Sequence, residues 1–160
     1  MHVAMQRDER ILFESFAKCA HKILEFGAGG STWVAAQQKK DWIVSIDSSK
    51  EWLTNVERET KEFPTQPDLV FVDIGPVKEW GFPTDETLRN SWPIYHELIW
   101  QRAHVQEADL FFVDGRFRVA CALQCLLHSK KEQFLECTIS KDLTTIRSWT
   151  LRGKLLRLVE

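Results

Sequence analysis

The 160-residue sequence lacks the features that mark several classes of protein. It has no run of about 18 apolar residues, and its N-terminus lacks the basic-then-apolar order of a signal peptide, so we expect neither a membrane span nor secretion. An excess of charge is also missing, because 21 basic and 23 acidic residues give a formal charge of −2. This balance provides no electrostatic footprint for nucleic acid or an anionic membrane. We therefore expect a cytoplasmic protein that acts on a small molecule.

Cysteine is scarce and forms no C-x-x-C pair; the four are Cys19, Cys121, Cys125 and Cys137. Their spacing fits neither a zinc site nor a disulfide framework, which favours a reducing compartment. Cys121 and Cys125 lie four residues apart in a helix-like run and share one face. We expect them to pack as buried apolar residues, with a redox or metal role as the alternative.

Length and patterning indicate one α/β domain over residues 1–160, since 44% apolar and 28% charged residues are typical of a globular chain. Strands are predicted at 23–26, 42–46, 68–72, 109–113 and 134–139. Helices are predicted at 7–20, after the turn at 27–32 to about 40, after a serine cap to about 62, and at 94–104 and 116–129. This alternation predicts a doubly wound, mostly parallel sheet. The tail at 148–159 is predicted as a hairpin turning at 152–154.

The ends of four predicted strands carry glycines or acidic residues. In parallel sheets, ligands bind outside the carboxyl ends of the strands, where the strand order reverses. That rule brings four features into one crevice: the turn at 27–32, Asp47, Asp73 and Asp114. We expect the ligand-binding site there.

The turn at 27–32 contains three glycines, which allow a backbone to approach a ligand closely. A dinucleotide fingerprint would read G-x-G-x-x-G, but Thr32 stands at the position of the last glycine. Glu25 precedes the turn, and a carboxylate there suits an ammonium or sulfonium ligand better than a pyrophosphate. Asp47 follows 22 residues later, about the spacing of an acid that accepts from ribose hydroxyls. A tight glycine-rich turn without a ligand is the alternative.

These residues resemble a known family. Glu25-Phe-Gly-Ala-Gly-Gly-Ser-Thr, followed by Ile46-Asp47, looks like motif I and the strand-two acid of class I S-adenosylmethionine-dependent methyltransferases. The likeness covers roughly residues 10–128. It is nearest to a subgroup with a GPxxEWG loop after strand three, at 75–81 here, and a VDGRFRVA segment after strand four, at 113–120 here.

The resemblance implies a Rossmann-like fold and S-adenosylmethionine as the cofactor. By that likeness, Glu25, Gly27 and Gly29 would line the methionine part of the cofactor, and Ser31 would also bind the cofactor. Asp47 would take the ribose, and Asp73 or Ile74 would border the adenine.

Three residues after the fourth strand are the candidate catalytic group: Asp114, Arg116 and Arg118. The resemblance places a substrate-facing acid at Asp114, which could orient or deprotonate a nucleophile. No metal is expected, because Asp114 and Asp73 supply too few oxygen ligands for a hard cation. The two arginines fall in the first turn of a predicted helix, where cations oppose the macrodipole. The basic pair therefore suggests a partner, which is Asp73, Asp114 or Glu79 within the protein or an anion on the substrate; solvated charges are the remaining alternative.

Residues 74–93 form a loop too long for an ordinary connection, and such loops are usually functional or disordered. Trp80 and Trp92 lie in it, and Tyr95 follows it. These aromatic side chains predict a lid that excludes water from the strand ends. A satellite cluster that packs the loop onto the domain is an equal alternative.

The likeness ends near residue 129, and only 31 residues follow. They leave little room for the helix expected between strand five and the hairpin, so the C-terminal part is shortened. A sheet edge could then be uncovered, and a second copy of the chain could cover it.

Together, these features predict methyl transfer from S-adenosylmethionine to an O or N nucleophile of a small substrate that could carry an anionic group. The alternatives are a non-catalytic cofactor-binding or regulatory pseudoenzyme and an NAD-type oxidoreductase.

Overall fold

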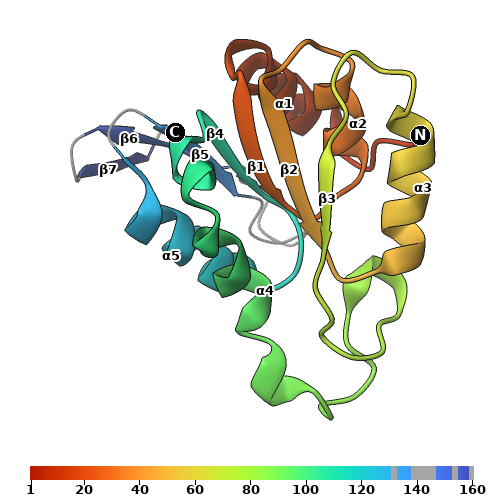
Figure 1. Ribbon diagram of the computed structural model, residues 1–160. Helices are drawn as coiled ribbons and strands as arrows, with labels where there is room; N and C mark the ends of the chain where they lie inside the picture. The colour runs from red at the N-terminus through yellow and green to blue at the C-terminus, as the bar shows by residue number, and fades with distance from the viewer. Residues whose placement is uncertain (131–132, 138–146, 153–154, 159–160) are drawn as a thin grey trace.

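A single seven-stranded sheet organises the computed structural model, which describes residues 1–130, 133–137, 147–152 and 155–158 (Figure 1). The strands are β1 (Lys22–Phe26), β2 (Trp42–Asp47), β3 (Asp68–Phe71), β4 (Leu110–Val113), β5 (Gln133–Cys137), β6 (Arg147–Arg152) and β7 (Leu155–Leu158). Their order is β3-β2-β1-β4-β5-β6-β7. The first five are parallel, whereas β6 and β7 run antiparallel to their neighbours. The predicted fold class is confirmed, and the strand order reverses between β1 and β4.

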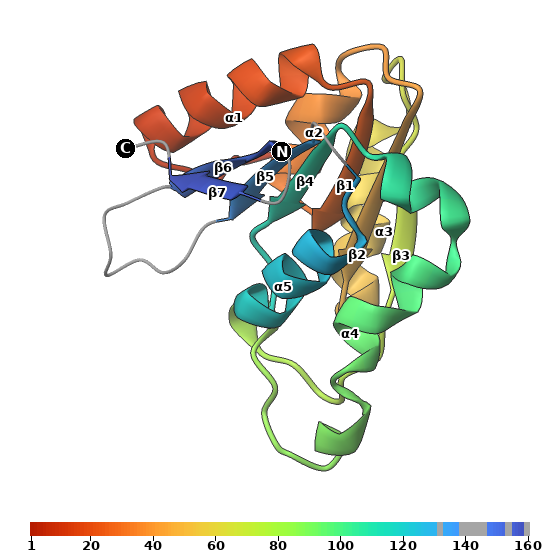
Figure 2. The ribbon, with the colours of Figure 1, turned by 90° about the vertical axis from the view of Figure 1, so that its left-hand side faces the viewer.

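Helices cover both faces of the sheet (Figures 1 and 2). One face carries α1 (Arg7–Cys19), α2 (Gly30–Ala36) and α3 (Lys50–Thr60), and the other carries α4 (Ile94–Glu97) and α5 (Arg118–His128). Successive side chains of β1 point to opposite faces of the sheet, so a separate core forms on each face. Ile23 packs with α1 and α2, whereas Leu24 packs with α5 and the aromatic residues that follow α4. Cys121 and Cys125 are buried on the sheet-facing side of α5, as expected.

The helix predicted at 94–104 is wrong beyond its first turn. After α4 the chain forms two 3₁₀ segments, Leu98–Gln101 and Ala103–Glu107, separated by the extended backbone of Arg102. The side chain of Arg102 reaches across to pair with Asp68 at the start of β3. The two segments bury Ile99, Trp100 and Val105 in the core, so packing in this region outweighs local helix propensity.

The start of the helix predicted at 116–129 also differs. Phe117 has a left-handed backbone, with φ of 53°, and the helix begins only at Arg118. Arg116 therefore precedes the helix and does not lie in its first turn.

The expected C-terminal hairpin is confirmed by the antiparallel pairing of β6 with β7. Its predicted turn falls partly outside the described residues. In the part of the chain that the structure describes, no helix is long and apolar enough to cross a membrane.

Candidate functional site

The turns that follow β1 and β4 touch backbone to backbone at the centre of the sheet edge. A Cβ on Gly27 would lie 2.5 Å from the backbone of Gly115, and Gly27 itself has φ of 103°. Phe26 accepts hydrogen bonds from the amides of Asp114, at 2.9 Å, and of Gly115, at 2.7 Å. Both positions therefore require glycine, because the two backbones lie too close together for a side chain. The contact also fixes the spacing of the two loops.

Glu25 lies buried beneath the glycine turn, only 2% exposed. Its carboxyl accepts hydrogen bonds from the hydroxyls of Ser31, Thr32 and Ser45. The Thr32 hydroxyl in turn accepts from the amide of Gly29 at 2.9 Å. Burial raises the pKa of Glu25 to about 7 against the lowering effect of the three hydroxyls. The network ties the turn to β1 and β2, so Ser31 points inward.

Asp47 ends β2 and is partly buried beside the same turn. Its Oδ1 accepts from the amide of Ser49 at 2.9 Å. Burial raises the pKa of Asp47 to about 6, although backbone hydrogen bonds from Ser49, Ser48 and Ala28 oppose the shift. The next hydroxyl, Ser48 Oγ, is buried and has no hydrogen-bond partner in the described part of the chain. The end of β2 thus offers a carboxyl acceptor and an unused hydroxyl.

Asp73 follows β3 and is exposed, with its Oδ1 accepting from the amide of Gly75 at 3.0 Å. It lies at the same carboxyl edge of the sheet as Asp47, because β2 and β3 run parallel in neighbouring positions. The register that pairs Asp47 with Phe71 brings these strand ends together, as predicted.

The two candidate arginines have different surroundings. Arg118 pairs with Asp114 at 3.0 Å and donates to the carbonyls of Asp114 and Gly115. Arg116 instead stacks on Phe82, with its guanidinium carbon 3.6 Å from the ring centre. Its Nε is buried and lacks a hydrogen-bond partner among the described residues. An internal ion pair therefore accounts for Arg118, while Arg116 keeps hydrogen-bonding capacity at the strand ends.

The loop after β3 contains an ordered hairpin over residues 76–84. The amide of Lys78 donates to Phe82 at 2.8 Å, and the amide of Thr84 donates to Pro76 at 2.8 Å. Trp80 and Gly81 form its tip, both with left-handed backbone, and Trp80 is 66% exposed. A Cβ on Gly81 would lie 3.2 Å from Ser48 Oγ and 3.4 Å from Arg116 Cγ. The tip therefore lies against residues that follow β2 and β4.

Trp92 and Tyr95 lie in a different place from this hairpin. Trp92 donates from its indole nitrogen to Ile74 at 2.9 Å and packs against Phe117. Tyr95 is 1% exposed and is part of the core, where its hydroxyl lies 3.4 Å from the carbonyl of Ile46. These two aromatic side chains thus pack the loop onto the domain, and Trp80 is the one at the exposed tip.

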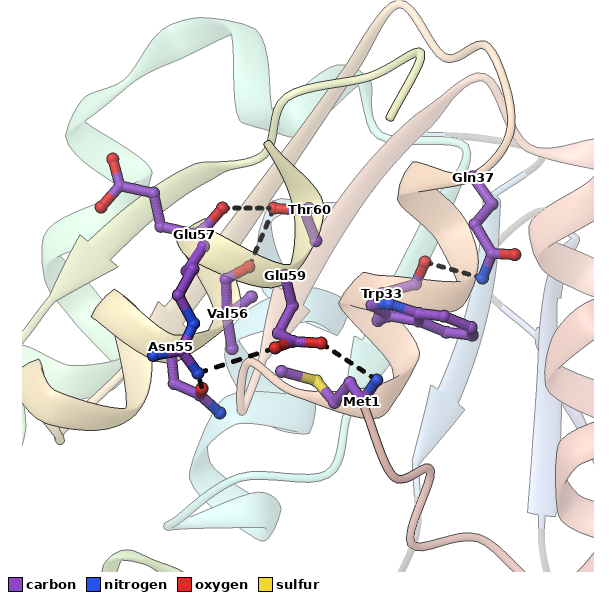
Figure 3. Close-up of polar contacts among 9 residues, drawn as sticks. Met1, Trp33, Gln37, Asn55, Val56, Glu57, Glu59 and Thr60 are labelled. Carbon is purple, nitrogen blue, oxygen red and sulfur yellow. Dashed lines mark hydrogen bonds and ion pairs between the residues drawn. The ribbon is translucent and has the colours of Figure 1, made fainter. Parts of the chain in front are cut away.

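Several contacts around the glycine turn cannot be predicted from the sequence pattern. Trp52, on α3, donates from its indole nitrogen to the carbonyl of Ala28 at 2.7 Å. The N-terminal residues also pack here, since a Cβ on Gly30 would lie 2.8 Å from Val3. Figure 3 shows the Met1 ammonium facing the Glu59 carboxylate between α2 and α3, at 3.2 Å. These contacts cover the outer side of the turn.

The sequence pattern also gives no sign of a second buried carboxyl, besides that of Glu25. Glu136, on β5, is 2% exposed, and its Oε2 has no partner in the described part of the chain. Burial, with added repulsion from Asp114 and Glu9, raises its pKa to about 8. A lone glutamate in a short apolar strand cannot be distinguished by sequence from one that faces solvent. In the described residues, no group of three metal-ligating side chains gathers.

No protein-family model matches the sequence, and no curated protein matches it either. Among solved structures, the chain is similar to a methyltransferase-like protein from Silicibacter pomeroyi DSS-3, with 31% sequence identity and a TM-score of 0.75. The match covers 84% of this chain and 72% of that chain. The likeness therefore includes the sequence as well as the arrangement of strands and helices.

Proposed function

The chain belongs to the family of methyltransferase-like proteins, and on that basis we propose that it binds S-adenosylmethionine and transfers a methyl group from it. The acceptor is an O or N nucleophile of a small substrate. The proposed site is the edge formed by the carboxyl ends of β1, β2, β3 and β4, where the strand order reverses.

The observation that carries the proposal is the end of β2. A partly buried carboxyl at Asp47 and a buried hydroxyl without a partner at Ser48, among the described residues, stand beside the glycine turn. A vicinal diol such as that of ribose offers two donors to the carboxylate and an acceptor to the hydroxyl. The residues present therefore fit an adenosine ligand. A buried hydroxyl without a hydrogen bond destabilises the folded protein, and such a ligand would supply the missing hydrogen bond to Ser48.

Other residues in the proposal hold this arrangement. Gly27 and Gly29 keep side chains out of the turn, so that a ligand can approach its backbone. Glu25 acts as a positioning residue, because its carboxyl holds Ser31 and Thr32 and, through Thr32, the amide of Gly29. Asp73 borders the far side of the site, after β3.

The reacting groups are assigned at the end of β4. When bound, S-adenosylmethionine supplies a methyl group on a sulfonium that leaves as a neutral thioether, so the protein mainly has to orient the acceptor. Asp114 faces the acceptor and accepts a hydrogen bond from its nucleophile. Arg116, whose Nε is unused, meets an anionic group on the acceptor, while Arg118 holds Asp114 in place. The 76–84 hairpin lies over this edge and excludes water.

Calorimetric titration with S-adenosylmethionine, S-adenosylhomocysteine and NADH tests the proposal. We expect binding of the first two, no binding of NADH, and about tenfold weaker binding by Asp47→Asn, the loss of one charge-assisted hydrogen bond. Asp41→Asn is the matched control, because Asp41 is exposed and precedes β2 at the opposite edge of the sheet. A folded protein that binds none of the three ligands would overturn the proposal. Binding without methyl transfer to any acceptor tested would make the chain a non-catalytic binder.

A further inference from the structure

The outer face of α5 is apolar although it faces solvent. Cys121 and Cys125 point into the core, and both are completely buried. On the opposite side, Val119, Leu123 and Leu127 are 67%, 54% and 77% exposed. Residues four apart lie on one helix face, so the three side chains form a continuous stripe about 12 Å long. We refer to these three residues as the α5 stripe.

Such a stripe does not stabilise the domain that carries it. Single exposed apolar side chains are common on protein surfaces, but a contiguous row marks an interaction site. Figure 2 shows α5 on the outside of the fold, next to α4 and away from the helices of the other face. The helix therefore has one apolar side for the core and a second for something outside the domain.

The surface at the N-terminal half of the stripe is hollowed. An open groove of about 490 Å³ is lined by Gly115, Arg116, Phe117, Arg118, Val119, Ala120 and Leu123. Its apolar walls come from α5 itself, and its cationic rim comes from the two arginines. A groove of this size accepts one or two large apolar side chains of a partner, and its rim favours an acidic residue beside them.

Basic residues outnumber acidic ones around the stripe. Between residues 115 and 131 the sequence has four basic residues and no aspartate or glutamate. Asp114 neutralises Arg118 at one end of α5, which leaves Arg116 as the additional cation there. At the other end, Glu107 is shared by Lys22 and Lys130, so one positive charge is again in excess. Both ends of the stripe are therefore basic.

We propose that the α5 stripe docks an acidic amphipathic helix of a partner protein. The partner's apolar residues cover Val119, Leu123 and Leu127, and its carboxylates face Arg116 and Lys130. A second copy of this chain is a poor occupant, because pairing two α5 helices in either direction brings basic ends together. This inference does not depend on the identity of the cofactor.

Two designed peptides of about 15 residues test the charge argument. They share one row of leucines at helical spacing, and the other positions hold glutamate in one peptide and lysine in the other. By fluorescence anisotropy at low salt, we expect the acidic peptide to bind at least about tenfold more tightly than the basic one. Equal binding of both peptides, or of neither, would overturn the proposal.

Two matched substitutions test the location. Leu123→Asp places a charge in the stripe, and Ile11→Asp places one at an isolated apolar residue on α1 with nearly the same exposure, 53% against 54%. We expect the first to weaken binding of the acidic peptide about tenfold and the second to leave it within about twofold. Val119→Asp repeats the test should Leu123→Asp fail to fold. Unchanged binding by the stripe variants would refute the location.

Two further outcomes would replace the partner that we propose. A concentration-dependent dimer in sedimentation that Leu123→Asp abolishes would identify a second copy. Binding to vesicles of anionic lipid, with none to the acidic peptide, would identify a membrane surface. Titration of the same variants with S-adenosylmethionine separates this inference from the proposed function, since a docking defect leaves cofactor affinity unchanged.

Discussion

Replacing the buried Glu25 carboxyl by an amide should change how the stability of this protein depends on pH. The Glu25 side chain is almost completely buried among three hydroxyl groups, and its pKa is raised from 4.5 to about 7 because burial disfavours the charged form. The folded chain therefore binds this proton more tightly than the unfolded chain does. Stability from this group is fully present below pH 4.5, declines as the pH rises from 4.5 to about 7, and is constant above that.

The size of the effect comes from the interval between the two pKa values. From 4.5 to about 7, at about 1.4 kcal/mol per pH unit, the free energy of unfolding falls by about 3 kcal/mol. Glu25→Gln removes this titration but keeps the shape of the side chain. Its amide oxygen can accept from two of the three hydroxyls, and its amide nitrogen can donate to the third. The variant should therefore resemble the wild type at low pH and exceed it above pH 7.

Urea denaturation followed by tryptophan fluorescence measures the difference between the two proteins at intervals from pH 4.5 to 8. We expect the variant to gain about 3 kcal/mol relative to the wild type across that range. Glu59→Gln is the control, because the Met1 ammonium lowers the pKa of Glu59 below 4.5, so that this carboxyl titrates below the measured range and the difference between Glu59→Gln and wild type should stay nearly constant from pH 5 to 8. A difference between Glu25→Gln and wild type that stays constant with pH would refute the reasoning.

Three other predictions concern the strand ends. Gly27→Ala should lower the free energy of unfolding by about 3 kcal/mol or prevent folding, because the new Cβ would lie 2.5 Å from backbone atoms. Gly29→Ala should lower it by less than about 1 kcal/mol, because its Cβ would make an ordinary contact at 3.6 Å. Urea denaturation measures both losses, and equal losses would contradict the geometry. Tyr95→Phe should cost about 1 kcal/mol by the same measurement, because the buried hydroxyl loses its contact with the carbonyl of Ile46; an unchanged midpoint would argue against that bond. Binding of S-adenosylmethionine should strengthen as the pH rises through about 6, where Asp47 ionises. If calorimetry shows an affinity that does not change between pH 5 and 7, that result would count against a ribose role for this carboxyl.

Sequence patterns are sufficient to predict the parallel sheet and to bring the candidate site residues that follow the strands to one edge of it. Apolar strands that end in an acid or a glycine are a local signal, and parallel pairing brings all such ends to one side. This is why Asp47, Asp73 and Asp114 could be assigned to one edge from the order of residues alone. The burial of Cys121 and Cys125 followed from helical spacing in the same way.

The features that the sequence could not predict arise from contacts between residues that are far apart in the chain. The carboxyl of Glu25 meets hydroxyls from α2 and β2, and no local pattern shows that these three elements converge. The helix near Arg102 is interrupted where Ile99, Trp100 and Val105 pack into the core, and the left-handed backbone of Phe117 places Arg116 before the helix. The segment after β3 is predicted only as a long aromatic loop, either a lid or a cluster packed onto the domain. Its organisation as a tight hairpin with Trp80 and Gly81 at the tip depends on contacts with residues that follow β2 and β4.

The contact between the turns after β1 and β4 limits how this protein can be re-engineered. Because Gly27 and Gly115 meet with no space between their backbones, a side chain or an insertion in either turn would displace the other. The two turns are thus a single unit for mutagenesis, and libraries that vary them independently would consist mostly of unfolded members. The 76–84 hairpin is closed by its own hydrogen bonds and has an exposed tip, so it can change length without that penalty. Libraries that vary this end of the sheet should therefore diversify the hairpin and keep both glycines.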